Sequence, residues 1–541
     1  MTRVPANLVA ALLALLTVTA SAVSPPMFSN EVAKVIAQAI ARAEQIEPGA
    51  AIAVVDREGY VLGVWSMNGK FATADELGNI LDAITKAGTA SFLSSDQHAF
   101  TSRTAGFIVQ QHFPPGIRNR PNGPLVGVNF SNLSFTDVNR FKNPIIGRDT
   151  GSTEGGTNGA SILDSRTVLA PLRFVFPAVS GLAGSPGGVP LFRDGMLIGG
   201  IGVAGRTRAP AGSPISGLAD IQVRQEYDPD EDVALAGQKG FQPSKEILGS
   251  HVFIDGIRVA YVKSNTRSGT VRPLGTVGVS VPSYPITSSP VVSYPSEEFG
   301  GQMCEIRSPI TNDIPGDING QPRLTADEVR QILSKSSARA KITRAGIRLP
   351  RGRASQNFIA VVSNPNETNQ PPVILGTIRT PGATFFSWDV AVQKARSALF
   401  FSDNTRAFST RTIGFLAQQF YPPGIADTPP GPFYALQEKF SLVPGGIVNP
   451  LNQAVGTSAL TDVPNPNLPN GVTIFPGGFP LYRHGVLIGA IGVSGDGIDQ
   501  DDIIAVAGTV DFLPPASIRA DYMQFRGARL PYAKFPRNPD L

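Results

Sequence analysis

The 541-residue chain is long enough for several domains. Its 46 Lys and Arg residues against 42 Asp and Glu residues leave a formal net charge of only +4, and no long basic run occurs, which argues against a protein that coats nucleic acid. A hydrophobic content of 42% excludes wholesale disorder, while 57 glycines and 47 prolines indicate many loops.

Residues 1–22 have the pattern of a signal peptide. Arg3 supplies the positive charge, residues 8–18 are apolar, and residues 20–22 (Ala-Ser-Ala) form a small-residue cleavage site. We therefore expect export to the periplasm or the extracellular space, with an uncleaved anchor as the alternative. We expect no membrane span after cleavage, because no later apolar run is long enough. The single cysteine, Cys304, excludes an internal disulfide and Cys-based metal sites.

Helical and strand patterns alternate after the signal segment. Apolar residues at helical spacing within residues 32–43 predict a helix. Two β-rich runs within residues 51–65 predict a hairpin that turns at residues 56–59. A second helix is expected to open at Thr73 and Glu76. This order is typical of an α+β domain.

The same alternation continues toward the middle of the chain. Residues 103–113 predict a short helix that ends at Pro114, because proline cannot continue a helix. Residues 190–205 predict two strands that turn at residues 194 and 195 (Asp-Gly). A last short helix is expected near the acidic residues 228–232, whose carboxylates favour the positive N-terminus of that helix.

An internal duplication organises the chain. Residues 99–117 match residues 407–425 at 12 of 19 positions, and residues 187–205 match residues 477–495 at 13 of 19 positions. A third, weaker match follows in the same order near the end of each copy. Two long copies indicate two similar domains rather than a solenoid of short repeats.

The duplication gives the predicted domain boundaries. We place copy one at residues 29–263 and copy two at residues 324–541. Residues 264–323 between them are rich in Ser, Pro and Gly and have little helical periodicity, which predicts an extended linker. The predicted fold class is therefore α+β, with two tandem copies of a small domain whose mostly antiparallel sheet is flanked by helices.

Motifs for common chemistries are incomplete. Residues 200–205 spell G-x-G-x-x-G after a strand, but the helix and acidic residue that a dinucleotide site needs do not follow, so we expect close backbone packing instead. A calcium-loop pattern from Asp317 lacks its glycine and predicts a turn before a helix capped by Thr325. With neither a nucleophile elbow nor a histidine cluster shared by the copies, we assign no catalytic residue and no enzymatic activity.

Both copies keep the same arginine, threonine and phenylalanine in the third predicted helix. A fixed arginine beside apolar residues suits an apolar ligand that carries a carboxylate. The structural alternative is equally good, because the arginine can bond a carbonyl and the phenylalanine can pack in the core. The retained residues that we consider as binding candidates are Arg103, Thr104 and Phe107 in copy one and Arg411, Thr412 and Phe415 in copy two.

The order of elements resembles the GlcG/HbpS-like haem-binding family, also called the haem-degrading domain family. The resemblance rests on the helix before residues 51–65, the stretch KAGTASFLSSD from Lys86, residues 187–205, and residues 491–508. It covers most of both copies. It implies a compact α+β domain, binding of haem or a related tetrapyrrole, and assembly as a homo-oligomer or, with two copies in one chain, an intramolecular pseudo-dimer.

A haem site needs an apolar slot, donors for two propionates and, optionally, an axial ligand. Arg103 and Arg411 are the candidate propionate partners. His98 and His112 are candidate ligands in copy one; we favour His112, beside Phe113, as the metal ligand and expect the other to be solvated. Copy two has no histidine at either position and would need Tyr421, another side chain or no strong ligand, so copy one is expected to bind haem better.

We therefore expect an exported protein that captures or carries haem, with haem as cofactor or cargo and no nucleic-acid partner. Two alternatives stay open. One is an enzyme that degrades haem oxidatively, and the other is a structural or interaction protein that binds no ligand.

Overall fold

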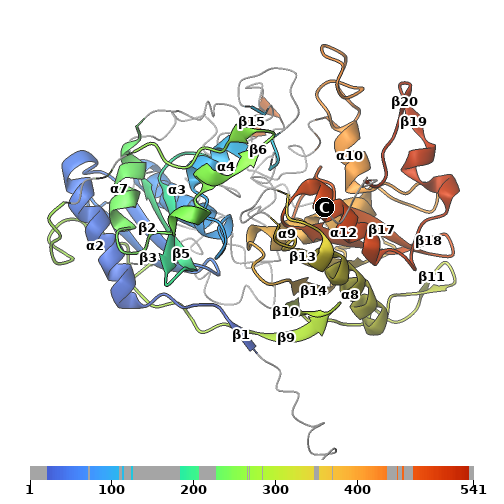
Figure 1. Ribbon diagram of the computed structural model, residues 1–541, viewed down its shortest axis with the longest axis horizontal. Helices are drawn as coiled ribbons and strands as arrows, with labels where there is room; N and C mark the ends of the chain where they lie inside the picture. Colours follow the sequence, from blue (N-terminus) through green and yellow to red (C-terminus); the bar gives the residue numbers. More distant parts are fainter. Residues whose placement is uncertain are drawn as a thin grey trace, which may run out of the picture.

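The computed structural model describes most of both copies and the segment between them. The described ranges are 21–70, 74–108, 183–205, 227–264, 269–282, 284–346, 352–367, 370–434 and 470–534, with short pieces at 113–114, 123–125, 266, 436, 447–448, 454–455 and 467–468. Helices cover mostly antiparallel sheets, so the predicted α+β class is confirmed (Figure 1). The described part contains no helix long and apolar enough to cross a membrane.

Copy one is a layered domain built on an antiparallel sheet of order β4-β5-β2-β3-β8. Helix α3 covers one face of the sheet, while α2 and α7 pack together on the other. Its elements are α2 (Ser29–Ile46), β2 (Ala51–Asp56), β3 (Val61–Ser66), α3 (Ala74–Phe92), α4 (Ser102–Ile108), β4 (Gly188–Arg193), β5 (Met196–Ala204), α7 (Pro229–Gly237), two 3₁₀ turns (Lys245–Ile247 and Gly249–His251), β6 (Phe253–Ile254) and β7 (Ile257–Arg258).

Copy two repeats this order of elements. Helix α9 lies on one face of its sheet, and α8 and α12 lie on the other. Its elements are α8 (Ala326–Ile342), β13 (Phe358–Ser363), β14 (Ile374–Arg379), α9 (Phe386–Phe400), α10 (Thr410–Leu416), β15 (Ile447–Val448), β16 (Ala454–Val455), β17 (Gly478–Arg483), β18 (Val486–Ser494), α12 (Ile498–Gly508), two 3₁₀ turns (Ala516–Ile518 and Ala520–Tyr522), β19 (Gln524–Phe525) and β20 (Ala528–Arg529).

The local signals in the sequence explain several of these boundaries. Thr325 caps α8 in a reciprocal capping box with Glu328, as predicted. The tight turn between β4 and β5 has positive φ at both Asp194 and Gly195, which is the conformation that two-residue hairpins need. In copy two the same turn places His484 at φ 48°, so a non-glycine residue adopts the left-handed region there.

The G-x-G-x-x-G stretch packs strand β5 against α3, as expected from its lack of nucleotide-binding features. A Cβ atom on Gly202 would overlap the carbonyl oxygen of Ala83, and one on Gly200 would overlap that of Ala87. In copy two, Gly492 approaches Ala391 on α9 in the same way. These glycines therefore set the distance between the sheet and its covering helix.

Replacing Gly202 with alanine is expected to lower the free energy of unfolding by about 3 kcal/mol, the upper end of the usual cost of overpacking, because the clash is with backbone. Urea denaturation measures the change. Gly49→Ala is the matched control, since nothing lies within 4 Å of a Cβ there, and it should change stability by less than about 0.5 kcal/mol. Equal losses in the two variants would contradict close packing at Gly202.

The segment predicted to be a linker is built into both sheets. Its strands are β8 (Val279–Ser280), which pairs with β3, and the hairpin of β9 (Ser293–Phe299) and β10 (Gln302–Ser308), which pairs with β14. A smaller hairpin, β11 (Asp317–Ile318) and β12 (Gln321–Pro322), precedes α8. Gly300 and Gly301 both have positive φ and form the two-residue turn between β9 and β10. Ser and Pro content suggested a linker, but the Gly-Gly turn between two β-rich runs is a hairpin signal.

Strand β1 (Ser21–Val23) lies at the edge of the sheet of copy two. It pairs with β9, so the N-terminal end of copy one contacts the other half of the chain. The predicted cleavage after residue 22 would remove two of its three residues.

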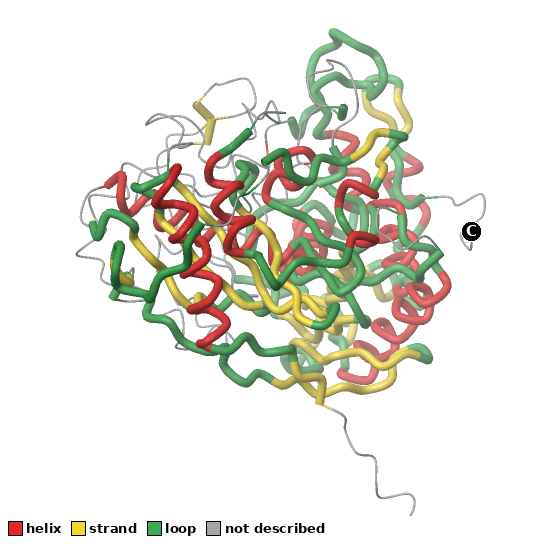
Figure 2. Tube along the Cα trace, turned by 60° about the vertical axis from the view of Figure 1, so that its left-hand side comes forward, coloured by secondary structure: helices red, strands yellow, loops and turns green. Residues whose placement is uncertain are grey.

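Helices lie beside the strands throughout the described part of the molecule (Figure 2), and one buried apolar cluster contains residues of both copies. The ring of Phe92, at the end of α3, lies 6.0 Å from that of Phe385, which precedes α9. Glu58, on the β2–β3 turn of copy one, accepts a 2.6 Å hydrogen bond from Nη2 of Arg307 on β10. The Arg307 guanidinium is fully buried and lies 3.5 Å from the ring centroid of Tyr294. An apolar contact and a buried ion pair therefore hold the copies together.

Candidate functional site

The acidic start of α7 is a buried ion-pair cluster. Asp230 lies 2.9 Å from Nζ of Lys86, and both side chains are fully buried. Glu231 accepts two hydrogen bonds from Arg103, at 2.7 Å from Nε and 3.0 Å from Nη2. The carboxylates thus pair with cations from α3 and α4 and join three helices.

Copy two builds the same cluster at the equivalent positions. Lys394 on α9 pairs with Asp501 at 2.8 Å, and Arg411 on α10 pairs with Asp502 at 2.8 Å and with Asp499 at 2.7 Å. The sequence analysis identified the arginines and the acidic stretches but missed both lysines. The duplication contained the signal, because Lys86 aligns with Lys394 at the same offset of 308 residues that relates the matching segments 99–117 and 407–425.

The two lysines differ in electrostatic environment. Burial alone would lower the pKa of Lys86, but Asp230 and Asp82 outweigh it and raise this pKa. For Lys394, burial lowers the pKa and Asp501 offsets this only in part. Val390 stands where copy one has Asp82, so copy two lacks the second carboxylate.

The retained threonines and phenylalanines also have structural partners. Thr104 donates a 2.7 Å hydrogen bond to the carbonyl oxygen of Ala260, and Thr412 donates one of 2.6 Å to that of Pro531. Phe107 packs edge-on against Phe113, as Phe415 does against Tyr421. The threonine hydrogen bonds tie the short helix of each copy to its C-terminal segment, and the ring contacts pack the helix against the residues that follow it.

The structure therefore favours the structural alternative for the retained set. Arg103 is 1% exposed and its guanidinium is already paired with a carboxylate. Arg411 is 18% exposed and contacts two carboxylates. Binding of a haem propionate by either residue would require breaking an ion pair that joins helices.

The candidate axial ligands divide into three cases. His112 lies outside the described residues. His98 is fully buried rather than solvated, with Nδ1 2.8 Å from Oγ of Ser95 and Nε2 2.8 Å from the carbonyl oxygen of Leu93, so that expectation was wrong. Tyr421 is buried and donates its hydroxyl to the carbonyl oxygen of Phe525.

Within the described ranges, no group of three or more His, Cys, Asp or Glu residues could hold a metal ion.

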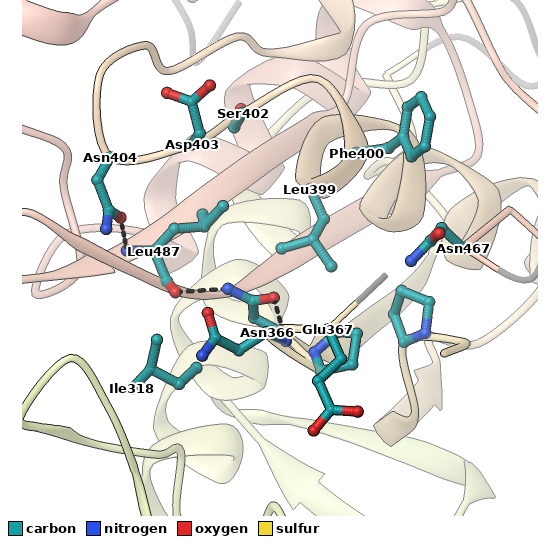
Figure 3. A pocket seen from close by; sticks show the side chains of 13 residues that line it. Ile318, Asn366, Glu367, Leu399, Phe400, Ser402, Asp403, Asn404, Asn467 and Leu487 are labelled. Atoms are coloured by element: carbon teal, nitrogen blue, oxygen red, sulfur yellow. Dashed lines mark hydrogen bonds between the residues drawn. The ribbon is translucent and has the colours of Figure 1, made fainter. Parts of the chain in front are cut away.

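A cavity of about 420 Å³ opens on copy two, between the β13–β14 turn and the C-terminal end of α9 (Figure 3). Its walls combine apolar side chains with amides and two carboxylates. The described lining residues are Ile318, Asn364, Pro365, Asn366, Glu367, Pro372, Leu399, Phe400, Ser402, Asp403, Asn404, Asn467 and Leu487. This volume lies within the usual range of small-molecule sites, about 300–1,000 Å³.

The chemistry of this cavity does not fit haem. Haem carries two propionates, which need cationic or donor groups at the rim of an apolar slot. The described lining contains no lysine, arginine or histidine, and it carries the carboxylates of Glu367 and Asp403. A dianion here would face two carboxylates without a cation among the described lining residues.

Comparison with known proteins gives one family match. Residues 368–509 match the family model described as "Haem degrading protein HbpS-like". No curated protein matches the chain.

Solved structures similar to this chain include a PduOC–haem complex, HbpS and the Klebsiella pneumoniae protein ORFY. Their sequence identities are 20%, 20% and 16%, with TM-scores of 0.22, 0.21 and 0.21. The alignments cover 35%, 36% and 41% of this chain and 93%, 94% and 95% of those chains. At residues 368–509, from just before β14 to the end of α12, copy two contains the segment that matches the HbpS-like family model.

Proposed function

We propose that this protein is exported and binds haem or a related tetrapyrrole, which it captures or carries. The observation that carries the proposal is the match of residues 368–509 to a family described by its action on haem. Apart from the short strands β15 and β16, the described elements of copy one repeat those of that segment in the same order, which supports a second domain of the same kind. The N-terminal signal pattern supports export.

Copy one is the better candidate for the haem site. The described cavity of copy two lacks a cation, and the arginines retained in both copies are engaged in ion pairs. Copy one has His112, whose imidazole could serve as an axial ligand. The proposal therefore assigns the strong binding site to copy one, with His112 as the iron ligand.

Titration of the full-length protein with hemin is expected to produce a saturable shift of the Soret band. His112→Ala should weaken binding and change the Soret position, because an axial imidazole sets the ligand field of the iron. The full chain is required, since the copies share a buried interface. His251→Ala, at an exposed histidine, is the control and should bind as the wild type does.

The hemin titration tests both haem binding and the role of His112 as the iron ligand. No Soret change with the wild type contradicts haem binding. A shift that His112→Ala leaves unaltered removes this residue as ligand and contradicts the assignment of the strong site to His112.

Oxidative degradation of haem is the second candidate function, and the description of the matched family favours it. Incubation of the hemin complex with a reductant under oxygen separates the two functions. Loss of the Soret band, with new absorption at longer wavelength that catalase does not prevent, would show turnover. A haem spectrum that persists supports capture or carriage.

A further inference from the structure

The cavity of copy two arises from a feature that copy one lacks. Strands β2 and β3 are joined by residues 57–60, whereas β13 and β14 are joined by the longer turn of residues 364–373. Residues 364–367 and Pro372 of this turn line the cavity opposite Leu399 and Phe400 of α9 (Figure 3). The short turn of copy one instead buries Glu58 against Arg307, so the two copies use this end of the domain differently.

Hydrogen bonds hold the wall in place. Asn364 donates its Nδ2 to the carbonyl oxygen of Leu487 at 2.7 Å and accepts the backbone N–H of Asn366 at 2.9 Å. At the other end of the turn, the carbonyl oxygen of Pro372 accepts a 3.2 Å hydrogen bond from Arg396. These hydrogen bonds hold both described ends of the turn against the body of copy two.

Charge narrows the ligand class. The described lining contains no cation, and residues 364–373 of the turn include no Lys, Arg or His either. Asp403 already pairs with Arg406 at 3.1 Å, and Glu367 accepts a hydrogen bond from Gln370. An anionic ligand would meet no cation in the described lining, and a cation would have to compete with Arg406 for Asp403 and with the Gln370 amide for Glu367. A neutral ligand fits best.

The polar and apolar parts of the wall narrow the class further. Asn404 accepts the N–H of Leu487 through Oδ1 at 2.9 Å, which leaves its Nδ2 as a donor. The side chain of Asn366 is exposed at the rim and offers both a donor and an acceptor. Leu399 and Leu487 supply apolar surface beside the ring of Phe400, which is 38% exposed. The amides can hydrogen-bond hydroxyl groups at the edges of a ligand, and the apolar side chains beside them can contact C–H groups on its faces.

From this juxtaposition we propose that the copy-two cavity binds a neutral saccharide. Hydroxyl groups act as donor and acceptor at once, and side-chain amides offer both roles. The C–H faces of a sugar ring then contact Phe400 and the two leucines. This site is separate from the proposed haem site and uses a turn found only in copy two.

Copy one supplies a natural control for the key amide. Asp96 stands at the position of Asn404 and accepts the N–H of Leu197 at 2.9 Å, just as Asn404 accepts that of Leu487. Asn404→Asp should therefore preserve the structural hydrogen bond. It removes only the Nδ2 donor and adds a negative charge.

The test is calorimetric titration of the full-length protein with maltose, cellobiose and N,N′-diacetylchitobiose, supported by saturation-transfer NMR. At least one disaccharide should bind, and Asn404→Asp should weaken it about tenfold or more. Asn366→Gly, which keeps the left-handed backbone found there, should also weaken binding. Asn30→Asp, the same chemical change at an exposed residue of α2, should not.

Three results would overturn the proposal: no binding of any of the three sugars at tens of millimolar, equal binding by Asn404→Asp, or tighter binding of spermidine or inorganic phosphate at the same residues. Hemin titration of Asn404→Asp keeps the two proposals distinct. It should match the wild type, so loss of sugar binding with normal hemin binding locates the failure in this cavity alone.

Discussion

Replacing Arg103 with methionine is expected to lower the free energy of unfolding by about 3–5 kcal/mol, the usual cost of leaving one partner of a buried ion pair uncompensated. Glu231 is 1% exposed and would keep the backbone N–H groups of Lys263 and Ser264, each at 2.9 Å, as donors but lose the guanidinium charge. Methionine approximates the length of the arginine stem, so the loss reflects charge more than volume. Urea denaturation at neutral pH measures it.

Copy two provides the matched comparison. Arg411→Met should cost less, because Arg411 is 18% exposed and water can reach Asp499, which is 41% exposed. The double variant Arg103→Met/Glu231→Leu should recover much of the stability, since it leaves no unpaired charge. If Arg103→Met left stability unchanged while hemin binding fell, the arginine would be a ligand-binding residue and the structural assignment would be wrong.

The second large effect is expected at the interface between the copies. Burial alone would raise the pKa of Glu58, but the Arg307 guanidinium and its hydrogen bond outweigh burial and lower this pKa to about 2. A carboxyl whose pKa is lower in the folded state stabilises the fold above its unfolded pKa and loses that effect as the pH falls. Between about pH 4.5 and 2, wild-type stability should therefore drop by about 3 kcal/mol through this group.

Glu58→Gln should remove that part of the acid dependence and destabilise the protein at neutral pH, because Arg307 then keeps only Glu305, at 3.1 Å, as a carboxylate partner. Denaturation curves recorded across this pH window test both effects. Glu298→Gln, at an exposed carboxyl on β9, is the control and should keep the wild-type profile. If Glu58→Gln and wild type lost stability in parallel between pH 4.5 and 2, the ion pair would not be a source of acid sensitivity.

Local signals accounted for the helices and hairpins because each depends on residues close in sequence. The capping box at Thr325 and the turn at Asp194 are examples. The β9–β10 hairpin was missed because Ser and Pro content was given more weight than the Gly-Gly turn. The pairing of β10 with β14 could not be predicted from composition, since it depends on contacts between distant segments.

The candidate site was harder to predict, because the same side chain can serve a ligand or the fold. Retention of Arg103 in the duplication fitted both roles, and only the position of Glu231, 128 residues away, favours one of them. His98 was expected to be solvated because it lies 14 residues from His112, too far for both to ligate one iron from the same helix face. Its burial depends on Ser95 and on a backbone carbonyl that happen to face both ring nitrogens.

Residues 264–323 contribute strands to the sheets of both copies. A copy expressed or exchanged with its predicted bounds alone would therefore lack part of its sheet. A fragment beginning at Leu324 would remove β9 and β10 and leave the edge of β14 unpaired, which invites strand-to-strand aggregation. The backbone N–H of Ser289 donates to the carbonyl oxygen of Met27, just before copy one. Strand β9 begins at Ser293, and Val291 between these two residues is 87% exposed. An exchange of sequence at residues 290–292 would keep β8 with the sheet of copy one and β9 and β10 with that of copy two, and among these strands it would separate only β1 from its partner β9.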